Sequence, residues 1–191
     1  MSEDGLLGFF SLASRLKHVH RAAFTEGRPE NSAEHAWHVA LIAVLLHPEV
    51  TPAPDLGQTL AMIAVHDVVE IEAGDTFAFD DRGLETQVER ERAAAEALFA
   101  RLPPAQSGRM HALWREFEEG VTPEARFAMG CDRLQGFLQQ VDCGAPAWAE
   151  VGLTRARSLK RMQPAIDLGA PFEGMINALY DRALELGLMR P

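Results

Sequence analysis

The chain has 191 residues, enough for one compact domain with its own hydrophobic core, and about half of them are apolar. Its 28 acidic residues against 18 Lys and Arg give a net charge of −10, so it lacks the cationic surface that binds nucleic-acid polymers and anionic membranes. Because it has two cysteines, acids near its first residue and no apolar run near the roughly 20 residues of a membrane span, we expect one cytoplasmic domain over residues 1–191.

Apolar residues recur at helical spacing along nearly the whole chain, and no stretch shows the alternation of a β-strand. Prolines in 48–54, and glycines with acids in 73–83, mark the two clearest loops. The expected helices cover approximately residues 5–18, 32–47, 55–71, 84–102 and 122–143, and others begin after Pro103, at Pro146 and at Pro171. The sequence therefore predicts an all-α helical bundle, with C-terminal helices over 146–191.

Four side chains of the kinds that bind metals lie where the helices should be buried. His35 and Asp132 lie on the apolar faces of two separate helices. His66 and Asp67 follow the apolar run 60–65 at the end of a third helix. A buried, unpaired carboxylate costs several kcal/mol, so these groups either pair or surround a divalent cation. Taken singly, a histidine of this kind is more often a hydrogen-bonded core residue than a ligand, and a buried aspartate is more often a helix cap or the partner of a nearby arginine.

Four short motifs follow one another along the chain. They are S-A-E-H (32–35), V-H-D-V-V-E (65–70), G-D-T (74–76) and C-D-R-L (131–134). Their order and spacing resemble the HD-domain superfamily of metal-dependent phosphohydrolases, and more narrowly the small 5′-deoxynucleotidase-like HD proteins. The resemblance covers a core of about residues 16–141. It implies an HD-domain helical bundle with a metal site in its core.

The resemblance implies that one divalent metal is held by His35, His66, Asp67 and Asp132. Imidazole and carboxylate donors suit Mn, Co, Fe, Ni or Zn, and such a metal activates water and neutralises charge on a phosphoryl group. One metal is expected, because His111 is the only histidine between Asp67 and Asp132, and two-metal HD enzymes typically need more there. The same scarcity argues against the alternative of a di-iron HD oxygenase.

Three further residues match functional positions of the family. The resemblance assigns Glu70 and Asp75 to the chemistry around the attacking water and the leaving group, where such acid–base help is worth roughly 10²–10⁴-fold. It assigns Arg21 to the phosphate, which a planar guanidinium suits. Without the resemblance, Glu70 is equally an exposed acid at a helix end, Asp75 a loop cap and Arg21 a surface arginine.

Two regions depart from the family pattern. Relatives often have a tryptophan just after the arginine, where this chain has Ala22. After G-D they often continue toward a proline, where this chain has Phe77 and Phe79. This aromatic pair could stack on a base or fill the core. The phosphatase chemistry is therefore better supported than selectivity for deoxynucleotides.

The predicted function is a metal-dependent phosphohydrolase that removes the 5′-phosphate from (deoxy)nucleoside monophosphates, with no nucleic-acid polymer or membrane as partner. Two alternatives are hydrolysis of another small phosphate ester and a non-catalytic helical module stabilised by its metal. The intact pair Glu70 and Asp75 argues against the module, because a structural site does not need them. The resemblance implies a homodimer, because family members are commonly dimers and the last helices have more apolar residues than a peripheral cap requires: Met175, Leu179, Leu186 and Leu188.

Overall fold

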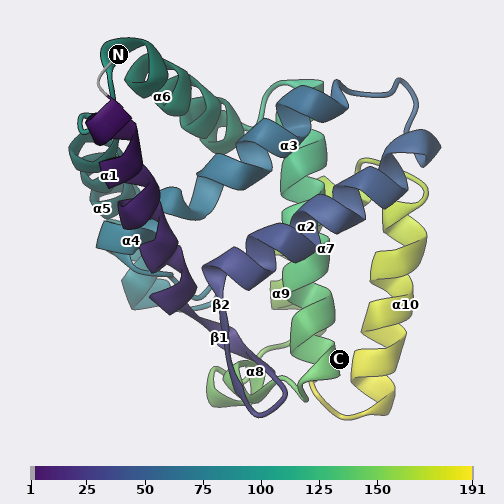
Figure 1. The fold of residues 1–191 in the computed structure, drawn as a ribbon. Helices are drawn as coiled ribbons and strands as arrows, with labels where there is room; N and C mark the ends of the chain where they lie inside the picture. The colour runs from purple at the N-terminus through teal and green to yellow at the C-terminus, as the bar shows by residue number, and fades with distance from the viewer. Residues whose placement is uncertain (1–2, 191) are drawn as a thin grey trace.

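A computed structural model describes residues 3–190, and over that range it confirms the all-α prediction apart from one small hairpin. The helices, labelled in Figure 1, are α1 (Glu3–Ala13), α2 (Ser32–Leu46), α3 (Leu56–Val65), α4 (Glu70–Ala73), α5 (Asp81–Phe99), α6 (Pro104–Glu119), α7 (Pro123–Asp142), α8 (Pro146–Glu150), α9 (Arg155–Ile166) and α10 (Phe172–Glu185). Short 3-10 helices cover Ser14–His18, His47–Glu49 and His66–Val69.

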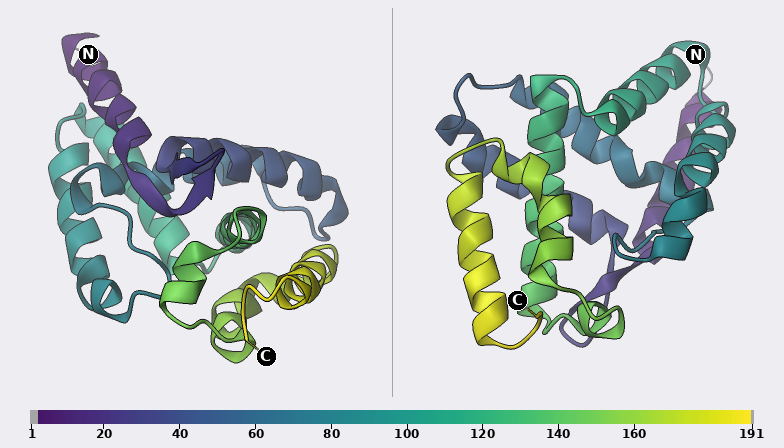
Figure 2. Two further views of the ribbon diagram at one scale, coloured as in Figure 1. Left: turned by 90° about the horizontal axis from the view of Figure 1, so that it is seen from below. Right: turned by 180° about the vertical axis from the view of Figure 1, so that it is seen from behind.

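Helix α7 is the centre of the bundle. It packs against α2, α3, α6, α9 and α10, and the left view of Figure 2 shows it nearly end-on between α2 and the C-terminal helices. Its beginning is encoded locally, because the Thr122 side chain accepts a hydrogen bond from the Ala125 backbone N–H at 3.2 Å and Pro123 takes the first helical position. Since α7 has neighbours on several sides, its polar residues Asp132 and Gln135 are enclosed by protein.

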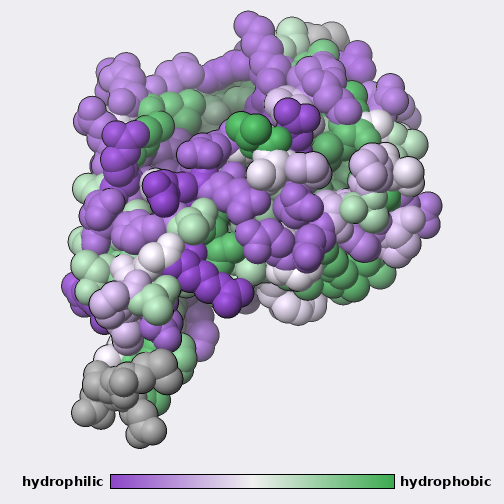
Figure 3. All heavy atoms as spheres, turned by 90° about the horizontal axis from the view of Figure 1, so that it is seen from above, coloured by the Kyte–Doolittle hydropathy of each residue, from purple (hydrophilic) through white to green (hydrophobic). Residues whose placement is uncertain are grey.

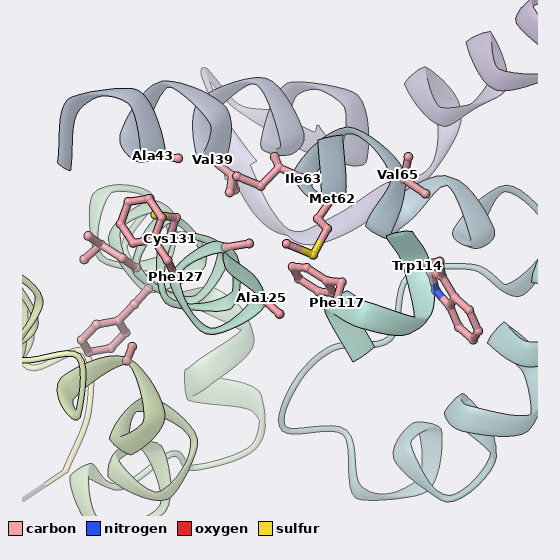
Figure 4. Close-up of a cluster of buried hydrophobic side chains, with 14 of the residues drawn as sticks. Val39, Ala43, Met62, Ile63, Val65, Trp114, Phe117, Ala125, Phe127 and Cys131 are labelled. Carbon is pink, nitrogen blue, oxygen red and sulfur yellow. The ribbon is translucent and has the colours of Figure 1, made fainter. Parts of the chain in front are cut away.

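The hydrophobic core lies where α2, α3, α6 and α7 meet (Figure 4). Val39 and Met62 are fully buried, and Phe117 and Phe127 are nearly so. Burying a side chain of this size is worth about 1.5–3 kcal/mol. Because the same four elements carry or flank the histidines and acids of interest, the core fixes the relative positions of those polar groups.

The antiparallel hairpin of β1 (His20–Thr25) and β2 (Arg28–Asn31) corrects the sequence prediction, which contained no strand. Its strands are short, and β1 buries a single residue, so no alternating pattern marks it. The turn depends on Gly27, whose φ of 82° lies in the left-handed region that favours glycine. The hairpin matters for function because β1 carries Arg21 and β2 carries Glu30.

The helix expected over 55–71 is divided in the structure. Helix α3 ends at Val65, and the 3-10 turn His66–Val69 intervenes before α4 begins. Side chains three residues apart eclipse in a 3-10 helix, whereas they are offset in an α-helix. Asp67 and Glu70 therefore project to the same side of the chain.

Two other expected helices are also interrupted. The one over 5–18 is α-helical only to Ala13 and continues as a 3-10 helix. The one that begins at Pro146 stops at Glu150, because Gly152 at φ 57° turns the chain before the separate helix α9.

Within residues 3–190, no helix combines the length and the apolar character needed to cross a membrane. The face shown in Figure 3 is largely hydrophilic, with separate hydrophobic patches. Large exposed apolar side chains include four on α2: Trp37, Leu41, Val44 and Leu45.

Candidate metal centre

Three separate segments bring metal-type side chains together. His35 from α2, His66 from the 3-10 turn and Asp132 from α7 offer ligand atoms that all lie within 4.8 Å of one another. Asp67 lies beside them, with Oδ1 3.0 Å from His66 Nε2 and Oδ2 3.8 Å from His35 Nε2. The four residues predicted from the sequence thus meet at one place, although His35 and Asp132 are 97 positions apart.

Local sequence places His35 in the first turn of α2. Asn31 caps this helix by accepting hydrogen bonds from the backbone N–H groups of Ala33 and Glu34. The Glu34 carboxylate accepts in return from the Asn31 backbone N–H, which completes a capping box. Fixed in this way, the next residue, His35, is completely buried.

Gln135, one turn after Asp132 on α7, sets the tautomer of His35. Its Nε2 donates to Glu30 Oε1 at 2.8 Å, so its Oε1 faces His35 Nδ1 at 2.5 Å. An amide oxygen only accepts, so Nδ1 carries the proton and Nε2 presents a lone pair toward Asp132. Metal-binding histidines are held by their second nitrogen in this manner.

His66 is oriented by the same principle. Its Nδ1 donates to the Ile63 carbonyl oxygen at 2.7 Å, so its Nε2 also presents a lone pair. Within the part of the chain that the structure describes, this Nε2 and Asp67 Oδ2 are buried and have no hydrogen-bond partner. Leaving such atoms unsatisfied costs roughly 1–3 kcal/mol each, which a bound cation would offset.

The donor set fits a divalent metal. His35 Nε2 lies 2.9 Å from Asp132 Oδ1, and two acceptors at that distance repel unless positive charge lies beside them. Burial lowers the pKa of His35 to about 4, so a second proton on its imidazole is not available at neutral pH. Two imidazole nitrogens with carboxylate oxygens suit Mn, Fe, Co, Ni or Zn.

Glu70 and Asp75 line the same cavity as His66, Asp67 and Asp132. Glu70 is buried and accepts a hydrogen bond from Ser32 Oγ at 2.6 Å. Asp75 Oδ1 accepts one from Arg21 Nη1 at 3.3 Å. Burial raises the pKa of both carboxyl groups, and nearby acids raise it further. Glu70 is therefore not the exposed helix-end acid that was the alternative.

Arg21 lies among the acids rather than on the surface. Its Nη1 is 3.3 Å from Asp75 Oδ1 and 3.6 Å from Asp67 Oδ2, and its Nε is 3.4 Å from Glu30 Oε2. The side chain is only 19% exposed. One guanidinium is thus shared by three carboxylates.

His66, Asp67, Asp132, Glu70, Asp75 and Arg21 line one cavity of about 320 Å³, whereas His35 lies buried behind its wall. Its wall includes Ala22, Phe77 and Phe79, the positions where the chain departs from the family pattern. The two phenylalanine rings meet edge to face at 5.6 Å between centroids and are only partly buried, so they shape the wall of the cavity. Seven carboxyl groups against three guanidinium groups line it, so it is strongly acidic until a cation binds.

The sequence did not identify three residues that hold the site: Ser32, Glu30 and Gln135. Ser32 precedes His35 by three residues and Gln135 follows Asp132 by three, so a helical-face argument could have found both. Glu30 had no comparable signal, because the hairpin that positions it was not expected.

The chain is similar to known proteins over most of its length. The model of the HD domain matches residues 13–171. The 5′-deoxynucleotidase HDDC2 of Xenopus laevis is 29% identical over 140 residues, which are 72% of this chain and 68% of that protein. The mouse protein of the same name is 27% identical over 141 residues, with 72% and 69% covered.

Solved structures of other proteins also resemble this chain. The crystal structure of a predicted metal-dependent phosphohydrolase from Magnetospirillum magnetotacticum MS-1 is 36% identical, with a TM-score of 0.84 over 98% of this chain and 95% of that one. A conserved hypothetical protein from Pyrococcus furiosus, at 19% identity and a TM-score of 0.66, shares the fold. The chain belongs to the HD-domain family. It is an HD-domain phosphohydrolase, as the four motifs predicted.

Removing the metal with a chelator is expected to lower the melting temperature by about 5–10 °C. A ligand at 100 times its Kd stabilises a protein by about 2.7 kcal/mol, and each kcal/mol shifts Tm by about 2–4 °C at this chain length. Calorimetry of loaded, chelated and Mn-restored protein measures the effect. Identical melting curves would show that the four side chains satisfy one another without a metal.

Proposed function

We propose that this protein hydrolyses the 5′-phosphate ester of (deoxy)nucleoside monophosphates, using one divalent metal held by His35, His66, Asp67 and Asp132. The observation that carries the proposal is the pair of histidine lone pairs, from His35 and His66, that face carboxylates beside Glu70. Relatives named 5′-deoxynucleotidase, at 24–29% identity, support the substrate class.

When bound, the metal supplies Lewis-acid chemistry: it activates water and neutralises charge on the phosphoryl group. Glu70, fixed by the hydroxyl of Ser32, is placed to hold or move a proton at the attacking water. Asp75, fixed by Arg21, is placed to serve the leaving O5′. Arg21 is the proposed phosphate contact.

The cavity supports a small substrate rather than a polymer. Its volume of about 320 Å³ is at the lower end of pockets that hold small molecules. Phe77 and Phe79 in its wall offer apolar faces for a base. Ala22 leaves room where relatives often have tryptophan, which should loosen contact with the sugar.

The substrate proposal predicts release of inorganic phosphate from 5′-nucleoside monophosphates. The assay uses protein reconstituted with Mn, Co, Fe, Ni or Zn, and compares kcat/KM for paired substrates such as dAMP and AMP. Because of Ala22, we expect less than about a tenfold preference for the deoxy form, since a single lost contact of about 1.4 kcal/mol is tenfold. A stronger preference would refute that selectivity. No release from any monophosphate with any of these metals, but release from another small ester, would leave only the phosphohydrolase class.

We further propose one cytoplasmic domain that forms a homodimer. The two cysteines are free, which suits a reducing compartment. Of the apolar residues expected to dimerise, Leu179 is buried against the rest of the chain, whereas Met175 is 41% and Leu186 58% exposed. On α2, Trp37 is 66% and Leu45 64% exposed, and we propose that this helix also contributes to the interface.

The dimer proposal predicts twice the 21 kDa chain mass in light scattering at micromolar concentration. Trp37→Ser combined with Leu45→Ser should give the monomer, because the pair removes the centre of the exposed apolar stripe. A monomer mass for the unchanged protein would contradict the proposal.

A further inference from the structure

Two arginines outside the predicted site line the same cavity. Arg133, on α7, directly follows Asp132, and Arg161 lies on α9, which packs along α7. Arg133 is half-buried, whereas Arg161 is exposed. One cation therefore lies next to a proposed metal ligand, and the other lies at the solvent side of the cavity.

Neither arginine forms an ion pair within 4 Å among residues 3–190, although Asp132 and Asp75 lie near enough to interact with them electrostatically. Arg133 Nη1 is buried and forms no hydrogen bond, and neither guanidinium is in an ion pair. Arg21, in the same cavity, is by contrast within 4 Å of three carboxylates. Arg133 and Arg161 therefore form no close ion pair even though seven carboxyl groups line the cavity with them.

The two cations are within electrostatic reach of each other. Both guanidinium groups line one cavity of about 320 Å³, and the helices that carry them, α7 and α9, pack against each other. Two like charges held together without an anion are unfavourable, and an anion between them would relieve the repulsion. Guanidinium groups bind phosphate oxygens through paired N–H donors, so phosphate is the anion that this geometry suits.

Arg21, the third cation of the cavity, is already surrounded by carboxylates that neutralise its charge. Arg21 is shared by Asp67, Asp75 and Glu30 at 3.3–3.6 Å. A phosphate dianion that enters a cavity with seven carboxyl groups needs positive charge that is not already paired. Among the side chains that line the cavity, Arg133 and Arg161 supply it.

We propose that Arg133 and Arg161 together bind the non-bridging oxygens of the substrate phosphate and make the cavity selective for phosphate monoesters. The proposal deepens the proposed function and rests on it. Because Arg133 follows Asp132 on the same helix, the anion is the phosphate beside the metal rather than a second, remote one. Arg21 remains a proposed contact of the same phosphate and also holds Asp67 and Asp75 in place.

The test measures binding of inorganic phosphate to the Mn-loaded full chain by calorimetry. Arg133→Gln and Arg161→Gln should each weaken phosphate binding by about 10–100-fold, as expected for the loss of a hydrogen bond to a charged group. Arg133→Lys should retain part of the affinity. Metal content should not change in any of these variants. Matched controls are Arg126→Gln on α7 and Lys160→Gln on α9, which are exposed, lie outside the cavity and should bind phosphate as the unchanged protein does.

Phosphate affinity within twofold of the unchanged protein in both glutamine variants, or no phosphate binding by the unchanged protein, would overturn the arginine pair. If Arg133→Gln loses metal, the phosphate affinity of Arg161→Gln decides whether the arginine pair binds phosphate, because Arg161 lies on another helix and is exposed. Weakened phosphate binding in a protein that hydrolyses no nucleoside monophosphate would refute the proposed substrate and leave the anion site in place.

Discussion

Replacing Asp132 with alanine is expected to remove the metal and to lower kcat/KM by at least about 10³-fold. Asp132 is the carboxylate that α7 contributes to the cluster, and its Oδ1 lies 2.9 Å from His35 Nε2. A metal supplies several kcal/mol of stabilisation to the charge that develops on the phosphoryl group, and each 1.36 kcal/mol is tenfold in rate. Metal analysis after gel filtration and phosphate-release kinetics measure the two effects.

Asp142→Ala is the matched control for this variant. Asp142 is at the end of the same helix, half-exposed, and pairs with Arg182 at 3.1 Å. A surface ion pair contributes at most about 1 kcal/mol, so metal content and activity should remain. An Asp132→Ala protein that retains its full metal would contradict the four-ligand assignment.

Replacing Glu70 with glutamine is expected to lower kcat by about 10²–10⁴-fold while metal content and fold remain. Glutamine keeps the shape of the side chain, and its Oε1 can still accept the hydrogen bond of 2.6 Å from Ser32 Oγ. It cannot take up or release a proton near neutral pH, so only the acid–base role is removed. Steady-state kinetics together with metal analysis separate that role from metal binding.

Glu72→Gln is the control for Glu70→Gln. Glu72 follows Glu70 by two positions. It is exposed and pairs with Arg15 at 3.3 Å on the surface. This variant should have normal kcat and KM. If Glu70→Gln lost the metal along with activity, Glu70 would be a ligand and its assignment to proton transfer would be wrong.

The sequence predicted that the metal-type residues lie close together, but it did not predict which side chains orient them. His35 and Asp132 lie on apolar helix faces, and a face that is buried in one bundle must meet the others, so their proximity followed from helical periodicity. The orientation of the His35 imidazole did not follow, because it depends on Gln135, 100 positions away in the chain. Contacts between side chains so far apart leave no local pattern.

Departures from regular helix were missed for a related reason. The stretch 55–71 has continuous apolar spacing, and the change to a 3-10 turn at His66 alters the geometry without altering the periodicity. The hairpin that carries Arg21 and Glu30 is too short for alternation to stand out. No sequence pattern marked a role for Arg133, whose side chain lines the cavity and forms no ion pair within residues 3–190.

The most direct test of the account is to locate the metal. Crystals of the Mn-loaded protein, measured at a wavelength where Mn scatters anomalously, should show one strong peak per chain. We expect it roughly 2.0–2.3 Å from His35 Nε2, His66 Nε2 and carboxylate oxygens of Asp67 and Asp132. A peak too far from His35 or His66 for a metal–ligand bond would contradict the account. So would a catalytically active protein with no peak at this position.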